Sequence, residues 1–245
     1  MLNIVIPMAG EGSRFQQSGF SKPKPFINVN GKPMIIKVLE NLNLPNSKYF
    51  LIARKEHLDQ EPEIVKEIKT DFNVTFIPIN KLTEGTACTI LFARKYINNN
   101  TPLLIANSDQ IVDFEPQKYI NDCYERNLDG SILTFIDKSR NPKWSFAKIN
   151  KNKKVTEVKE KSPISEYATV GIYLYSRGSD FCNAALDMLI NNDRTNNEFY
   201  TCPTYNYAIR EGLDIGIYNI DHKLMHGLGT PEDLNNYLSL KNRVS

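Results

Sequence analysis

The sequence has no long apolar run and no paired cysteines. No apolar stretch in the 245 residues approaches the roughly 20 residues that a membrane-spanning helix needs. The N-terminus also lacks the basic segment and following apolar run of a secretion signal. Cys88, Cys123, Cys182 and Cys202 form no C-x-x-C pair, which argues against a zinc site and a redox pair. We therefore expect a soluble, cytoplasmic protein with no secretion signal, no membrane partner and reduced, mostly buried thiols.

The chain also lacks an excess of charge of one sign. Lysine and arginine number 30 against 28 aspartate and glutamate residues, so we expect no nucleic-acid partner, while small anionic substrates stay compatible with this balance. The length and the 41% hydrophobic content are typical of a globular protein with a large core. We expect a single domain over residues 1–245, as a monomer or a homo-oligomer.

The first half of the chain alternates apolar, β-branched runs with helical patterns. Strands are expected at 2–7, 49–54, 74–79 and 102–107, and helices from Pro33, at 57–70 and at 87–96. Such alternation is typical of βαβ crossovers, and it predicts an α/β fold with a doubly wound, mostly parallel, Rossmann-like sheet. In such sheets ligands lie beyond the carboxyl ends of the strands.

The second half shows shorter strands joined by turns. Strands are expected at 130–136, 145–149, 154–159, 168–175 and 214–220, and helices up to Arg126, after Ser179 as the N-cap, at 203–211 and after Pro231. Strands joined by short turns pair antiparallel. We therefore expect added antiparallel strands in this half of the sheet.

The stretch from residue 4 to residue 35 combines a buried strand, the glycine turn GEG and three cations. Arg14, Lys22 and Lys24 follow the turn before the next helix begins. Bare backbone N–H groups in such a turn can approach phosphates, and fixed positive charge neutralises them. The turn is not the dinucleotide fingerprint, because Phe15 stands at the third glycine position, nor a Walker A loop, because Pro33 follows Gly-Lys. The pattern indicates a nucleoside triphosphate site of another kind.

MAGEGSRF and PKPFINVNGKPMI, in this order between a strand and a helix, resemble the signature of nucleotidyltransferases of the nucleoside-diphosphate-sugar pyrophosphorylase superfamily. Weaker likenesses follow in TEGTA, NSDQ, VGIY and GLGTPEDL. The resemblance implies a Mg²⁺-dependent enzyme whose small-molecule substrates are an NTP and a phosphorylated acceptor, with pyrophosphate as the second product. In-line attack on the α-phosphorus needs positioning and charge neutralisation and no protein nucleophile.

The resemblance assigns roles to individual residues. Arg14 and Lys24 would be catalytic cations on the triphosphate, and Asp109, at the end of an apolar strand, would bind the metal. The second aspartate of the superfamily, from D-x-G-T, is replaced here by Gly227. The implied nucleotide-binding residues are Met8, Ala9, Gly10, Gly12, Ser13, Glu84, Gly85 and Thr86.

The acceptor side is expected between residues 146 and 205. Lys161 and Gly171 match the E-K-P and G-I-Y elements of the superfamily, and Glu198 and Tyr200 lie in a polar, aromatic stretch that could line the acceptor pocket. Packing of Phe199 under a loop is the alternative for that stretch.

The acceptor, and with it the product, is suggested by one stretch in which this sequence differs from the family pattern. Relatives that accept hexose phosphates usually carry Tyr-Gly where this chain has Phe146-Ala147-Lys148. Among compact members, the chain is similar to the cytidylyltransferases that act on phosphoglutamine in capsular phosphoramidate biosynthesis, which implies CTP and phosphoglutamine as substrates. Two alternatives stay open: synthesis of a dTDP-, UDP- or CDP-hexose, and a catalytically silent nucleotide-binding regulator.

Overall fold

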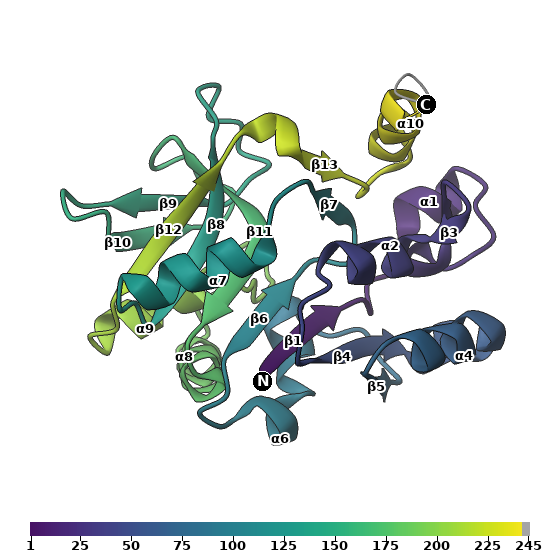
Figure 1. Ribbon diagram of the computed structural model, residues 1–245, viewed down its shortest axis with the longest axis horizontal. Helices are drawn as coiled ribbons and strands as arrows, with labels where there is room; N and C mark the ends of the chain where they lie inside the picture. The colour runs from purple at the N-terminus through teal and green to yellow at the C-terminus, as the bar shows by residue number, and fades with distance from the viewer. Residues whose placement is uncertain (242–245) are drawn as a thin grey trace.

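The computed structural model describes residues 1–241, and its centre is a mixed sheet with helices on both faces (Figure 1). The strands of this sheet are β1 (Leu2–Pro7), β4 (Ser47–Arg54), β5 (Val74–Ile79), β6 (Leu103–Ala106), β8 (Gly130–Ile136), β9 (Phe146–Ile149), β10 (Val155–Lys159), β11 (Tyr167–Tyr175) and β12 (Ile215–Ile220). Their order is β10-β9-β11-β6-β1-β4-β5, with β8 also beside β11 and β12 beside β8.

The two halves of the sheet differ in strand direction. β1 runs parallel to both β4 and β6, and β4 runs parallel to β5. β11 is antiparallel to both β6 and β8, and β9 and β10 form an antiparallel hairpin. This confirms the predicted fold class, a mostly parallel α/β sheet with antiparallel strands added by the second half of the chain.

Helices cover both faces of the sheet. They are α1 (Ser13–Gln17), α2 (Met34–Asn41), α3 (Lys55–Gln60), α4 (Pro62–Asp71), α5 (Thr86–Leu91), α6 (Arg94–Ile97), α7 (Pro116–Glu125), α8 (Gly178–Ile190), α9 (Thr204–Arg210) and α10 (Pro231–Lys241), with 3-10 turns η1 (Lys24–Phe26) and η2 (His222–Leu224). Residues of α2, α4 and α7 share one buried cluster, and residues of α5, α6, α8 and α9 share the other. Within residues 1–241, no helix has the length and apolar character needed to cross a membrane.

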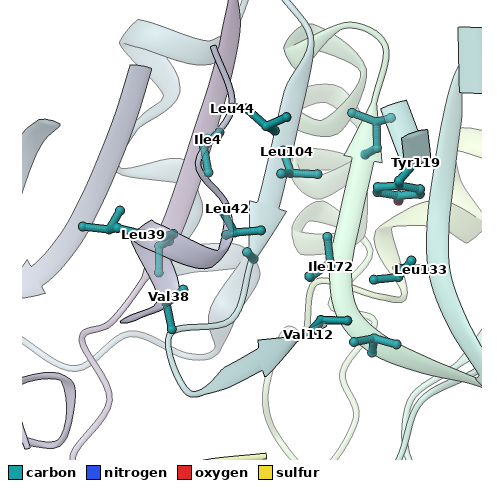
Figure 2. Packing of buried hydrophobic residues seen from close by; sticks show 14 of the residues in the cluster. Ile4, Val38, Leu39, Leu42, Leu44, Leu104, Val112, Tyr119, Leu133 and Ile172 are labelled. Atoms are coloured by element: carbon teal, nitrogen blue, oxygen red, sulfur yellow. The ribbon is translucent and has the colours of Figure 1, made fainter. Parts of the chain in front are cut away.

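β1 shows how the sequence pattern builds these two layers. Its side chains alternate, so Ile4 faces the cluster under α2 while Val5 faces the cluster under α5 and α8. Figure 2 labels Ile4 in this buried cluster together with Leu104 of β6 and Leu39 of α2. Full burial of a side chain of this size stabilises the fold by about 1.5–3 kcal/mol. A strand that is apolar on both faces therefore has to be covered on both sides.

A third, smaller core lies away from the main sheet and joins the two ends of the chain. Phe15 of α1 packs in one cluster with Leu234 and Tyr237 of α10, so the C-terminal helix lies beside the N-terminal loop (Figure 1). Two small sheets support this region: β2 (Asn28–Val29) with β3 (Lys32–Pro33), and β7 (Gln110–Val112) with β13 (Met225–Gly227).

Several predicted boundaries were wrong for local reasons. The helix expected at 57–70 is two helices, because Pro62 disfavours helical backbone at the preceding Glu61, which has φ −126° and ψ 55°. The helix expected at 87–96 is divided into α5 and α6. Ser179 is not an N-cap: α8 begins one residue earlier at Gly178, where an added Cβ would lie 2.1 Å from the carbonyl oxygen of Ile97. Pro33 precedes α2 as its N-cap and is not its first residue.

Candidate active site

A cavity of about 890 Å³ opens at the carboxyl ends of β1 and β6, the edge at which the sequence predicts ligands. Segments from both ends and the middle of the chain line it. They include Met8, Gly10, Gly12, Arg14, Lys24, Thr86, Asp109, Gln110, Ser145, Glu160, Lys161, Gly171, Tyr200, Gly227, Gly229 and Asp233. Ten of the residues predicted to form the site are thus brought to one place. Ala9, Ser13, Glu84, Gly85 and Glu198 do not line the cavity.

The glycine turn positions the two predicted catalytic cations. Gly12 has φ +66°, and a Cβ there would lie 3.0 Å from Cβ of Lys24, so glycine lets Lys24 lie directly against the turn. The buried ring of Phe15 anchors α1 and lies 5.8 Å from Nζ of Lys24. Arg14 is exposed to the cavity and forms no ion pair with the part of the chain that the structure describes. Lys22 instead pairs with Glu61, at 2.7 Å.

Lys24 and Asp109, which both line the cavity, form an ion pair. Nζ of Lys24 lies 2.5 Å from Oδ2 of Asp109, and both side chains remain about one-fifth to one-quarter exposed. The backbone N–H of Leu228 donates to the carbonyl oxygen of Asp109 at 2.7 Å. A predicted metal ligand and a predicted phosphate contact therefore lie within reach of one bound triphosphate.

The oxygen ligand that Asp109 offers fits the Mg²⁺ ion that the family resemblance implies. Within residues 1–241, no group of three or more His, Cys, Asp or Glu side chains is placed to hold a metal ion. Mg²⁺ does not require one, since it is commonly bound by one or two carboxylates together with substrate phosphates and waters. Asp109 is a hard oxygen donor that lines the cavity beside Arg14 and Lys24.

The loop predicted to read the base is fastened to the acceptor segment. The N–H of Phe199 donates to the carbonyl oxygen of Glu84 at 2.7 Å, and the N–H of Ala87 donates to that of Phe199 at 2.9 Å. Between them Gly85 has φ +123°, and a Cβ there would lie 2.4 Å from the oxygen of Phe199. The carboxylate of Glu84 turns away from the main cavity and pairs with Arg194 at 2.5 Å. Only Thr86 of this predicted group of three faces the cavity.

Lys161, Tyr200 and Glu198 form a hydrogen-bonded chain at the acceptor end. Nζ of Lys161 donates to the Tyr200 hydroxyl at 2.6 Å and lies 4.5 Å from the centre of the ring, and that hydroxyl donates to Glu198. Burial and the bond to Glu198 raise the pKa of Tyr200 above its ordinary value, so the phenol stays protonated. Glu198 therefore acts on the cavity through Tyr200.

Sequence reasoning missed several polar residues of the acceptor wall. Glu160 accepts a hydrogen bond from the Ser145 hydroxyl, and burial raises the pKa of Glu160 although Ser145 and Lys161 oppose this. Glu160 was signalled only as the neighbour of Lys161. Ser145 carried no signal, because it lies in an irregular loop whose position depends on the pairing of β9 with β10.

Gln110 is a third polar residue to which sequence reasoning assigned no individual role, although it lies in the NSDQ run. Its side chain is about nine-tenths buried at the floor of the cavity, and its Nε2 has no hydrogen-bond partner among the described residues. An unpaired buried N–H₂ group is costly unless a bound molecule supplies an acceptor. It lies beside Gly171, where a Cβ would be 2.2 Å from Nδ2 of Asn107, so this wall of the cavity is closely packed.

Comparison with known proteins identifies the family of the chain. The sequence matches the nucleotidyl transferase family over residues 4–206. The bifunctional protein GlmU of Methanococcus aeolicus is 23% identical over 176 residues, which cover 71% of this chain and 40% of that protein. The mannose-1-phosphate guanylyltransferase catalytic subunit beta of Dictyostelium discoideum is 26% identical over 167 residues, covering 56% of this chain and 45% of that protein. This chain thus spans less than half the length of these relatives.

Solved structures share the whole fold. A nucleoside-diphosphate-sugar pyrophosphorylase from Vibrio cholerae superposes with a TM-score of 0.82 at 24% identity, covering 96% of this chain and 99% of that chain. The inositol-1-phosphate CTP transferase of T. maritima superposes with a TM-score of 0.75 at 12% identity, covering 97% and 94%. At these identities the similarity establishes the fold.

Proposed function

We infer that this chain, which belongs to the nucleotidyl transferase family, transfers a nucleotidyl group from a nucleoside triphosphate to a phosphorylated acceptor and releases pyrophosphate. The observation that carries this proposal is the convergence of Arg14, Lys24 and Asp109 on one wall of a cavity whose other wall carries Lys161. Two anionic substrates need cations on both sides of the bond that forms.

The reaction follows from that arrangement. A phosphate oxygen of the acceptor attacks the α-phosphorus in line, the new P–O–P bridge forms, and the bond to the β-phosphate oxygen breaks to release pyrophosphate. Arg14, free of ion pairs with the described residues, would lie on the β- and γ-phosphates and stabilise the negative charge of the leaving group. Lys24 would follow the charge as it shifts, and Lys161 would hold the attacking phosphate.

Asp109 would hold Mg²⁺, which when bound neutralises the phosphate oxygens of the triphosphate. The ion pair with Lys24 keeps the Asp109 carboxylate turned toward the phosphate cations. Lys24, whose ammonium group lies against the carboxylate of Asp109, would bind the phosphates of the triphosphate beside the metal that Asp109 would hold.

For the substrates, we propose CTP and phosphoglutamine. CTP rests on the sequence resemblance to cytidylyltransferases. The acceptor is supported by the chain Lys161–Tyr200–Glu198, in which a cation and a hydroxyl line the cavity and an acid accepts a hydrogen bond from that hydroxyl. Phosphoglutamine carries both positively and negatively charged groups, and this chain of side chains likewise contains a cation and an acid. Names of the relatives, such as mannose-1-phosphate guanylyltransferase, favour a sugar 1-phosphate as the second candidate.

Pyrophosphate release tests the proposal. The purified protein is incubated with Mg²⁺ and each of the four common ribonucleoside triphosphates or dTTP, against phosphoglutamine, a set of hexose 1-phosphates and a buffer blank. We expect release with CTP and phosphoglutamine. Release only with hexose 1-phosphates would replace the acceptor assignment, and no release with any pair would favour a silent nucleotide-binding protein.

A further inference from the structure

The segment that ends β13 lies directly beside Asp109 and carries no side chain there. Gly227 pairs with Gln110 across β7 and β13, and the N–H of Leu228 donates to the carbonyl oxygen of Asp109 at 2.7 Å. In the superfamily that this sequence resembles, an aspartate occupies the position of Gly227. The chain therefore lacks a carboxylate at Gly227, one residue before the backbone hydrogen bond to Asp109.

Asp233, from the first turn of α10, places a carboxylate in that space. A Cβ at Gly227 would lie 3.8 Å from Cγ of Asp233. A Cβ at Gly229 would lie 3.3 Å from Oδ2 of Asp109 and 3.9 Å from Oδ2 of Asp233. The two carboxylates thus border one small space that stays open because both intervening residues are glycine.

Asp233 also has a structural role that leaves one of its oxygens unused. Its Oδ2 accepts from the hydroxyl of Thr230 at 2.7 Å, and its N–H donates to that hydroxyl at 3.1 Å, which together cap α10. Its Oδ1 accepts no hydrogen bond from the residues that the structure describes. The cap accounts for the orientation of the side chain, and it leaves a donor oxygen for a ligand.

The position of Asp233 relative to the phosphate cations is set by packing. Leu234 and Tyr237 of α10 lie in the same buried cluster as Phe15, the neighbour of Arg14. The carboxylate at 233 and the guanidinium at 14 are therefore carried by elements that share one core. Gln110, which pairs with Gly227 across β7 and β13, has a nearly buried Nε2 without a partner among the described residues, and this donor suits an oxygen of a bound substrate.

We propose that Asp233 is the second carboxylate ligand of the Mg²⁺ that Asp109 would hold, and that it takes the part of the side chain missing at Gly227. Two hard carboxylate oxygens, with phosphate oxygens and waters, make a set that suits Mg²⁺. This inference rests on the proposed function, because it takes the metal from that reaction.

Mn²⁺ binding separates this role from capping. The affinity of the whole protein for Mn²⁺ is measured by electron paramagnetic resonance, alone and with the non-reactive analogue α,β-methylene-CTP. We expect Asp233→Asn and Asp109→Asn each to weaken Mn²⁺ binding by about tenfold or more. Thr230→Ala removes the cap but keeps the carboxylate, so it should lower the melting temperature and weaken Mn²⁺ binding less than Asp233→Asn does. Wild-type Mn²⁺ affinity in Asp233→Asn would overturn the assignment.

The second experiment moves the proposed metal-binding carboxylate from position 233 to position 227 by mutation. Gly227 can accept a side chain, since its φ is not positive and the nearest atom to an added Cβ is 3.8 Å away. Gly227→Asp in the Asp233→Asn background should restore most of the Mn²⁺ affinity, and no recovery would show that Asp233 does not replace residue 227. Absence of pyrophosphate release from the wild-type protein would reject the proposed function instead, and these binding results do not depend on it.

Discussion

Two sides of the cavity are built in different ways. The side expected to hold the nucleoside triphosphate is called the donor wall here, and the side expected to hold the phosphorylated acceptor is called the acceptor wall. The predicted donor wall takes both cations from one continuous segment, in which Gly12, Arg14 and Lys24 follow a single strand, and Asp109 joins them from the loop after β6. The predicted acceptor wall uses side chains from three separate segments, and its polar groups are joined to one another, as in Lys161–Tyr200–Glu198 and Ser145–Glu160. A site for a common triphosphate can be a fixed motif, whereas a site for a particular acceptor is assembled from relays that a few substitutions could change.

Arg14 offers the most severe test of the donor wall. Because Arg14 would stabilise charge that grows as pyrophosphate leaves, Arg14→Ala should lower kcat by about 10²–10³-fold while changing KM for the acceptor little. Arg177→Ala is the matched control, since Arg177 pairs with Asp180 at the start of α8, and it should keep wild-type turnover. Steady-state pyrophosphate release measures both. A wild-type kcat in Arg14→Ala would remove the cation from the mechanism.

Gly85 tests the connection between the two walls. Gly85→Ala puts a Cβ about 2.4 Å from the Phe199 oxygen at a positive φ, so it should lower the free energy of unfolding by about 2–4 kcal/mol. Gly10→Ala has no atom within 4 Å of the added Cβ and should change stability by less than about 0.5 kcal/mol. Urea denaturation compares the two variants. Equal stability losses would mean that the clamp at Phe199 does not stabilise the fold.

Lys161 tests the acceptor wall alone. Lys161→Met removes a charge-assisted contact to the attacking phosphate, so KM for the acceptor should rise about 10–30-fold while KM for the NTP changes less than about threefold. Lys159→Met serves as the control, because Lys159 lies 3.4 Å from Glu157 and does not line the cavity. If both variants raise KM for the acceptor equally, the overall positive charge of the protein, and not a contact made by Lys161, determines how tightly the acceptor binds.

Substitution of Glu160 should have the smallest effect, a change in how the free energy of unfolding depends on pH. Burial raises the pKa of Glu160 above that of the unfolded chain, so its contribution to stability is fully present below the unfolded pKa and is lost as pH rises through the folded pKa. Glu160→Gln should therefore gain stability relative to wild type on going from acidic to neutral pH, by no more than about 1 kcal/mol. Thermal unfolding across that range measures the difference. An unchanged difference would place the Glu160 carboxyl in water.

The corrected helices show where local patterns are insufficient. The run 57–70 has helical periodicity throughout, yet Pro62 divides it, because the constraint that a proline places on the residue before it outweighs the periodicity of the flanking residues. Ser179 is a good capping residue by type. The start of α8 at Gly178 was decided instead by its close approach to Ile97, which lies 81 positions earlier in the chain.

The sequence by itself determined the sheet, the donor wall and the cations, because strand periodicity, a glycine turn and neighbouring charges are local features. The tertiary structure alone decided which distant side chains meet. The contacts Tyr200 to Lys161 and Asp109 to the glycines before α10 arise from packing across 39 and more than 100 positions. No local pattern encodes such contacts, since they depend on how β11 and α10 close on the first half of the fold.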